Sequence, residues 1–139
     1  CRAEIKYETY AKAINIEARS MIDIASKHII PAVIKYITSL ATSINQVKEA
    51  CGGVTVDVQT ELLKESSDLL TATRDALVEL TLKADKASAM RRGKEQAEFY
   101  LREVVPVMNS LRAPVDRLEM IVNKEMWPMP SYGDLLFEV

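Results

Sequence analysis

The chain has 139 residues and a mass of 15.6 kDa, which is the length of one domain. Apolar residues make up 48% and charged residues 27%, a globular composition that excludes disorder as the main state of the chain. The formal net charge of -2 leaves no basic excess for binding a run of phosphates, so nucleic acid is not an expected partner. Four glycines and five prolines are too few for a turn-rich β-sandwich or a glycine-lined phosphate loop.

No apolar run reaches the roughly 18 residues that a membrane span needs, and no signal peptide pattern opens the chain. We therefore expect a soluble, cytoplasmic protein without a membrane partner. The two cysteines, Cys1 and Cys51, show neither metal-ligand spacing nor a disulfide framework. The sequence begins with Cys rather than Met and at once enters charged, helix-compatible sequence, so we expect a piece of a longer chain.

The first predicted helix covers residues 2–51 and is interrupted near a proline. Its second half has apolar residues at alternating spacings of three and four, which is the pattern of a helical packing seam: Ile30, Val33, Ile37, Leu40, Ile44, Val47 and Cys51. An upstream stripe has a different phase: Tyr7, Tyr10, Ile14, Glu17, Met21, Ile24 and His28. Because proline removes a backbone hydrogen bond and clashes with the preceding turn, Pro31 predicts a kink near residues 27–31, with helix on both sides.

The second predicted helix covers residues 56–91. Gly52 and Gly53 end the first helix, and Thr55 or Asp57 can cap the next one with a side-chain oxygen. A broad stripe, wide enough for two neighbouring helices, follows the same alternation: Leu63, Ser66, Leu70, Thr73, Leu77, Leu80, Ala84 and Ala87, beside Leu62, Leu69 and Ala76.

The third predicted helix covers residues 93–124 and follows the basic turn at residues 91–93. Its seam again alternates four and three: Ala97, Leu101, Val104, Met108, Leu111, Val115, Leu118 and Val122. Pro106 and Pro114 lie off this seam, so we expect them to bend the helix without removing core side chains.

Residues 125–139 form a predicted extended tail, because the proline-rich run at its start cannot continue a helix. Large apolar groups gather in this short stretch, and together they would form a sticky patch if they were exposed. We therefore predict a docking strip that lies against this domain or a neighbouring one, with these residues: Trp127, Pro128, Pro130, Tyr132, Leu135 and Phe137.

Together these patterns predict an all-α fold, a single domain over residues 1–139 in which three long helices run up, down and up. At 1.5 Å per residue the first helix would be about 73 Å long, against about 54 Å and about 48 Å for the others. Its N-terminal part should therefore overhang the bundle, or fold back at Pro31 so that the first helix reads as two and the bundle as four.

The sequence offers no arrangement of ionisable residues that predicts a catalytic site. His28 is the only histidine, and neither cysteine lies at ligand spacing from it, so we expect a structural or partly exposed side chain. Glu17 falls on the stripe of the first helix, where we expect exposure to solvent at the overhang rather than burial. We assign no catalytic, cofactor-binding or metal-binding residue to this chain.

Both ends of the sequence carry specific motifs. Near the start they are Tyr7-Glu8, Ile14-Asn15-Ile16-Glu17-Ala18, Met21-Ile22-Asp23 and Ile30-Pro31-Ala32-Val33. Near the end they are Leu111-Arg112-Ala113, Asp116, Leu118-Glu119 and, most specifically, Trp127-Pro128-x-Pro130-x-Tyr132-Gly133-Asp134-Leu135-Leu136-Phe137. These motifs resemble those of the C-terminal helical domain of type III glutamine synthetases, and the resemblance spans nearly the whole chain.

The resemblance implies a parent enzyme that joins ammonia to glutamate with ATP, in the cytoplasm, and that assembles as a homo-oligomer. It implies Mg or Mn and ATP in an upstream catalytic domain, and it transfers no catalytic residue to these 139 residues. The chain would be a non-catalytic accessory domain that packs against the upstream domain or other subunits. The alternative is a free-standing helical bundle that binds partner helices in a groove, and the same seams are compatible with it.

Overall fold

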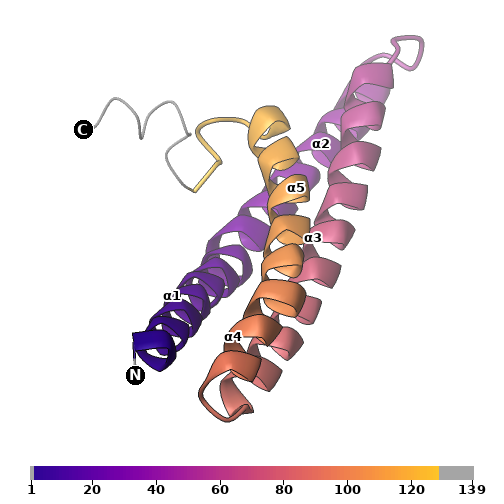
Figure 1. The fold of residues 1–139 in the computed structure, drawn as a ribbon. Helices are drawn as coiled ribbons and strands as arrows, with labels where there is room; N and C mark the ends of the chain where they lie inside the picture. The colour runs from indigo at the N-terminus through magenta and orange to yellow at the C-terminus, as the bar shows by residue number, and fades with distance from the viewer. Residues whose placement is uncertain (1, 129–139) are drawn as a thin grey trace.

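The computed structural model describes residues 2–128 and shows three antiparallel helical rods, with no strand among those residues (Figure 1). This confirms the predicted all-α fold and its up, down and up course. The first rod consists of α1 (Arg2–Ile24), the π turn η1 (Ala25–Ile29) and α2 (Ile30–Ala50); the second is α3 (Asp57–Ala89); the third consists of α4 (Lys94–Phe99), the π turn η2 (Tyr100–Val104) and α5 (Val105–Ile121).

Each π turn ends two residues before a proline. The Ile30 N–H donates to the Ala25 carbonyl, and the Val105 N–H donates to the Tyr100 carbonyl, which is the wider hydrogen bonding of a π turn. Pro31 and Pro106 then lie at the beginning of α2 and α5, where a missing N–H costs little. The predicted interruption near Pro31 is therefore a local widening, and helix continues on both sides.

In the first rod the π turn explains the change of phase. The buried row of the first rod up to the π turn is Ala11, Ala18 and Ala25, with Ile14 and Met21 packed beside it. The predicted stripe was right at Ile14 and Met21 but passed over the alanines and wrongly included Tyr10, which is exposed. Glu17 and His28 are exposed, as expected for these two side chains. After the turn the buried row continues through Ile29, Val33, Tyr36 and Leu40.

The same shift corrects the seam of the third rod. The π turn adds a residue to the helical turn, so Tyr100, 2% exposed, is buried and Leu101, 55% exposed, faces outward, opposite to the prediction. The other predicted seam positions of this rod are buried or half-buried. Pro106 is exposed as predicted, but Pro114 is buried inside α5, so the prediction that it lies off the seam was wrong.

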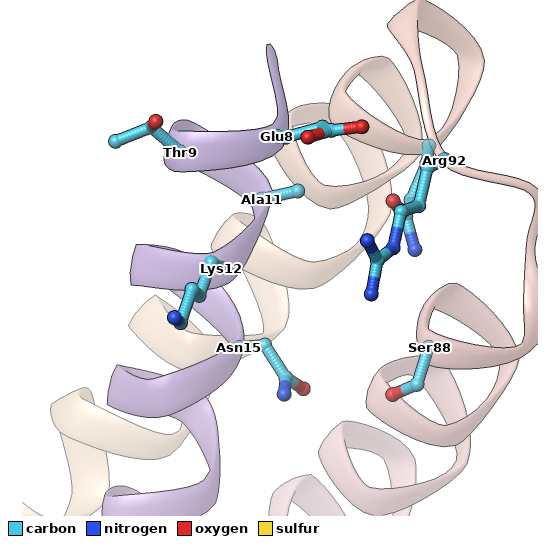
Figure 2. Close-up of a pocket in the computed structure, with 8 residues that line it drawn as sticks. Glu8, Thr9, Ala11, Lys12, Asn15, Ser88 and Arg92 are labelled. Carbon is cyan, nitrogen blue, oxygen red and sulfur yellow. The ribbon is translucent and has the colours of Figure 1, made fainter. Parts of the chain in front are cut away.

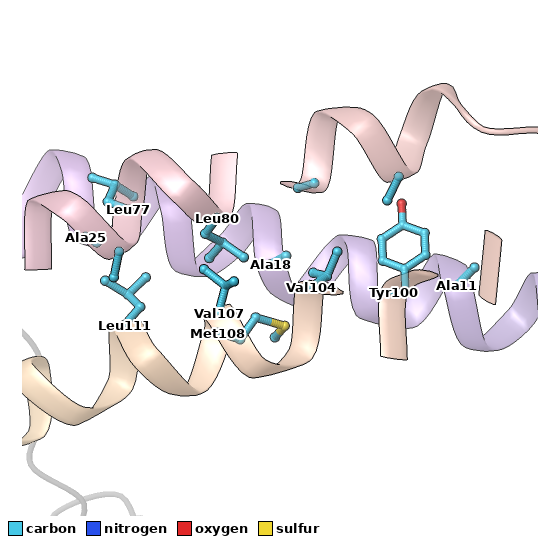
Figure 3. Close-up of a cluster of buried hydrophobic side chains, with 13 residues drawn as sticks. Ala11, Ala18, Ala25, Leu77, Leu80, Tyr100, Val104, Val107, Met108 and Leu111 are labelled. Atoms are coloured by element: carbon cyan, nitrogen blue, oxygen red, sulfur yellow. The ribbon is translucent and has the colours of Figure 1, made fainter. Parts of the chain in front are cut away.

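A first hydrophobic cluster joins α1, α3 and the third rod (Figure 3). Small side chains on facing helices let the backbones approach closely, and this cluster contains many of them: Ala11, Ala18, Ala25, Ala76, Ala84 and Ala87. Figure 3 shows Leu111 pointing from α5 toward Ala25. Tyr100 is the largest fully buried side chain among the described residues.

The first helix neither folds back nor leaves a long overhang. Because Ala11 and Ala18 are buried in the same cluster as the C-terminal half of α3, α1 continues the line of α2 and packs along α3, as Figure 1 shows. The expectation of a fourth bundle element at Pro31 was therefore wrong, since a π turn bends the chain far less than a loop.

The α2–α3 hairpin extends past the end of the third rod (Figure 1). Ile44 and Val47 are half-buried, and Cys51 is exposed rather than on a packing seam as predicted. The N-cap residue of α3 is Val56, which makes no side-chain cap bond, so neither proposed residue occupies that position. Thr55 still satisfies one N–H of the first turn, because the Asp57 N–H donates to its hydroxyl (3.2 Å). This uncovered hairpin end is called the α2–α3 arm below.

Within α3 the predicted stripe is confirmed from Ser66 to Ala87. Two of its buried positions are polar. The Thr73 hydroxyl donates to the Leu69 carbonyl (2.8 Å), whereas the Ser66 hydroxyl oxygen is buried without a hydrogen-bond partner. Nothing in the structure explains why Ser66 is polar.

The π turn of the third rod gives a direct test. We expect Tyr100→Ala to lower the free energy of unfolding by about 3 to 5 kcal/mol, because it empties a fully buried site. Leu101→Ala should change it by less than about 0.5 kcal/mol, because that side chain is exposed. Denaturant titration of both variants checks this, and equal losses would contradict the π-turn register.

Candidate docking surface

Residues 122–128 reverse the chain after α5 around a single asparagine. The Asn123 carbonyl accepts hydrogen bonds from the N–H groups of Met126 (2.9 Å) and Trp127 (3.0 Å). Its side-chain Oδ1 accepts a further bond from the Glu125 N–H (3.0 Å). Asparagine suits this position because its short amide bonds readily to the backbone two residues on. The turn brings Trp127 back onto the bundle.

Trp127 is 9% exposed and belongs to a second hydrophobic cluster, formed by α2, the end of α5 and this turn. Its buried members are Ile29, Val33, Tyr36, Leu40, Leu118, Val122 and Trp127. Of the predicted docking strip, Trp127 thus lies on this chain's own helices and Pro128 is exposed. The other four residues lie outside the described part of the chain: Pro130, Tyr132, Leu135 and Phe137.

One titratable group lies within this second cluster. Burial raises the pKa of the Tyr36 phenol above its usual value of 10.0, and the charge of the Glu65 carboxylate raises it further. Glu65 is itself held by Arg117 of α5, whose guanidinium lies 2.8 Å from its Oε1. The Glu65–Arg117 pair thus joins α3 to α5 at the level of Tyr36.

Further ion pairs join the rods at the surface, and sequence reasoning missed them. Arg112 of α5 pairs with Glu17 of α1, so Glu17 is half-exposed as expected, but within the bundle rather than at an overhang. Lys83 of α3 pairs with Glu103 at 3.3 Å. Exposed pairs contribute only about 0 to 1 kcal/mol each, so they favour one register between rods more than they stabilise the fold.

An apolar hollow lies between the first rod and α5, next to the second cluster. Its volume is about 180 Å³. The wall is made of apolar side chains from both rods, with two charged residues at the rim: Met21, Ile24, Ala25, Ile29, Leu111 and Val115, then Arg112 and Asp116. We call it the η1–α5 hollow.

A second depression, of about 580 Å³, lies on the outer side of α2 beside Pro128. Lys27, Lys35 and the exposed His28 line it together with the carboxylate of Glu125, so charges of both signs are present. Lys27 forms an ion pair with Asp23 at 2.7 Å.

A third depression, of about 500 Å³, lies between α1 and the turn that precedes α4 (Figure 2). Figure 2 shows the Arg92 side chain entering it from that turn, with Lys12 and Asn15 on α1. Glu8 also lines it, so charges of both signs are present. Gln96 also lines it and donates to the Ala87 carbonyl (3.0 Å), which at the end of α3 also accepts a hydrogen bond from the Met90 N–H (3.2 Å).

Among the described residues, no group of three or more His, Cys, Asp and Glu side chains is placed to hold a metal ion. No described helix is long and apolar enough to cross a membrane. The surface features that remain for a functional interpretation are apolar and electrostatic, namely the Trp127 turn, the three depressions and the α2–α3 arm.

Comparison with known proteins gives one consistent result. Residues 1–48 match the family model described as the glutamine synthetase C-terminal domain. A glutamine synthetase of Bacteroides fragilis is 33% identical over 141 residues, covering 99% of this chain. The chain is similar to the C-terminal domain of glutamine synthetases. A type-3 glutamine synthetase of Dictyostelium discoideum is 30% identical over 98% of the chain, and a glutamine synthetase of Butyrivibrio fibrisolvens is 28% identical over 99%.

These findings confirm the resemblance to type III glutamine synthetases drawn from the sequence motifs. The chain spans about a fifth of the length of the curated relatives it matches: 19% of the Bacteroides protein, 19% of the Dictyostelium protein and 20% of the Butyrivibrio protein. The matched part of these relatives corresponds to the helical bundle described above.

The buried Trp127 should be essential to this end of the bundle. We expect Trp127→Ala to lower the free energy of unfolding by about 3 to 5 kcal/mol, because it empties the second cluster. Met126→Ala is the neighbouring control, since that side chain is exposed. Thermal denaturation checks both, and an unchanged midpoint for Trp127→Ala would contradict the packing.

The Tyr36 phenol predicts a dependence of stability on alkaline pH. Its pKa is higher in the folded than in the unfolded chain, so above about pH 10 the unfolded chain releases this proton first and the free energy of unfolding falls. Below that pH the phenol is protonated in both states and this contribution is constant. Tyr36→Phe should remove this part of the alkaline loss.

The measurement is urea unfolding of the native chain and Tyr36→Phe between pH 7 and 11. The difference between the two free energies should stay constant up to about pH 9 and change above pH 10, in favour of the Phe variant. Parallel curves over the whole range would show that the phenol titrates normally in the folded chain.

Proposed function

We propose that this chain serves as a non-catalytic C-terminal accessory domain of a type III glutamine synthetase, supporting domain packing and oligomer assembly. One observation carries the proposal: relatives named glutamine synthetase match 98–99% of this chain, yet the match covers only about a fifth of each of them. The remaining four fifths of such a protein have room for the catalytic domain, and this chain would be an added module.

The whole protein would be a cytoplasmic ligase that makes glutamine from glutamate, ammonia and ATP. Mg or Mn and ATP would be bound in the upstream catalytic domain, and no residue of this chain is assigned to them. The partners would be that upstream domain and other subunits of a homo-oligomer. No nucleic acid or membrane enters the proposal.

Two features of the surface support a packing role. Val78 and Leu82 lie one turn apart on α3 and are exposed, so an apolar strip on this rod is available for burial against another domain. The α2–α3 arm adds half-buried and exposed apolar side chains at the other end, including Val58.

The proposal is tested first by reading the coding sequence upstream of Cys1 and then by expressing the whole product. We expect a long open frame with a synthetase domain. Deleting residues 1–139 of the present numbering should change the oligomer mass in light scattering while the isolated domain turns over no ATP. ATP turnover by the isolated chain would contradict the non-catalytic role.

A second test is Leu82→Glu in the whole product. This variant places a charge on the apolar strip of α3 and leaves the core intact. A smaller oligomer mass with an unchanged helical spectrum would support packing through this strip. A start codon within a few residues upstream of Cys1 would overturn the proposal in favour of the free-standing interaction module.

A further inference from the structure

We propose that the η1–α5 hollow is the docking site for the apolar triplet Leu135, Leu136 and Phe137 of this chain's own C-terminal segment, with one side chain of the triplet entering it. The proposal concerns a surface of the bundle and an occupant within the same polypeptide. It goes beyond the accessory role proposed above and does not depend on it, because it requires no ligase and no other subunit.

The hollow has the size and chemistry for one large apolar side chain. Its volume is about 180 Å³ and its wall is apolar, with charge confined to Arg112 and Asp116 at the rim. An apolar cavity of about 150 Å³ inside a protein stays dry and accepts benzene, so a hollow of this size can take a phenyl ring or a branched aliphatic group. A charged or strongly polar occupant would lose its hydration without gaining hydrogen bonds.

The hollow is continuous with a surface that the tail already occupies. Ile29 belongs to the cluster that buries Trp127 and also lines the hollow, and Val115 packs against that cluster and lines the hollow as well. The cluster that buries Trp127 therefore adjoins the hollow. A segment of the same chain is already held close to the hollow, so its binding does not carry the entropy cost of bringing in a second molecule.

The length of the remaining segment allows this placement. Eleven residues follow Pro128, and Leu135 is the seventh of them, so the backbone reaches up to about 23 Å when extended. Charge does not direct the tail, because the depression beside Pro128 contains Glu125 as well as Lys35, and Lys27 is already paired with Asp23.

Disulfide trapping in the 139-residue chain tests the proposal. In a Cys1→Ser and Cys51→Ser background, Glu138→Cys is combined with Asp116→Cys at the rim of the hollow. The control combines Glu138→Cys with Asp75→Cys, which replaces an exposed aspartate on α3 instead. We expect an intrachain disulfide to form at least tenfold faster in the rim pair than in the control, at a rate independent of protein concentration.

Equal rates for the two pairs would overturn the proposal. A rim disulfide that forms between chains, at a rate rising with concentration, would also overturn it, because a second copy would then be the occupant. Phe137→Ala should slow trapping of the rim pair several-fold, whereas Val139→Ala should leave it unchanged. If both changes have the same effect, the apolar triplet is not what seats the tail. Circular dichroism confirms that every variant keeps its helices.

Discussion

Burial of α3 between the other two rods is the interaction on which the rest of the structure depends. Its inward stripe is wide enough to serve two neighbours, and it contributes Leu77, Leu80 and Ala84 to the first cluster, whereas its partly buried Leu62 and Leu69 pack against the second. The first rod and α5 also meet directly, through Leu111 beside Ala25 and through the second cluster. The open space that remains between them is the η1–α5 hollow, which exists because both rods pack on the same central helix.

Two prolines shape the rods that flank α3. In each rod a π turn precedes the proline, so the helix continues while its inward face rotates. The rotation lets Ala25 and Ile29 both face the interior in the first rod, and it turns Tyr100 inward in the third. At these two positions proline therefore rotates the buried face of the helix and does not end the helix. This explains why rods this long stay packed along their length.

Much of the fold could be predicted from the sequence, because apolar spacing identified three helices and nearly all of the α3 stripe. The errors have physical causes. The periodicity argument assumes 3.6 residues per turn. Because a π turn has an extra residue, the argument placed Leu101 on the buried seam and left out Tyr100. Alanine gives a weak hydrophobic signal, so Ala11 and Ala18 were passed over although close packing needs them.

The candidate surface could be predicted only in part. Trp127 stood out in the sequence as a large apolar residue outside a helix. The η1–α5 hollow has no local sequence pattern, because it forms where separate helical elements meet. Ion pairs such as Glu17 with Arg112 likewise join residues far apart in the sequence, so no local pattern predicts them.

The α2–α3 arm gives this bundle a gradient of local stability. Its backbone hydrogen bonds lie where only two helices meet, and Val58 and Cys51 add little buried surface there. Opening of the arm from its glycine turn exposes few apolar contacts, whereas opening near Leu80 disrupts a fully buried core. Amide hydrogens should thus exchange fastest toward the Gly52–Gly53 end and slowest at mid-bundle. Insertions at that turn would lengthen a peripheral element and leave both hydrophobic clusters untouched, so sequence length can vary there at little cost to folding.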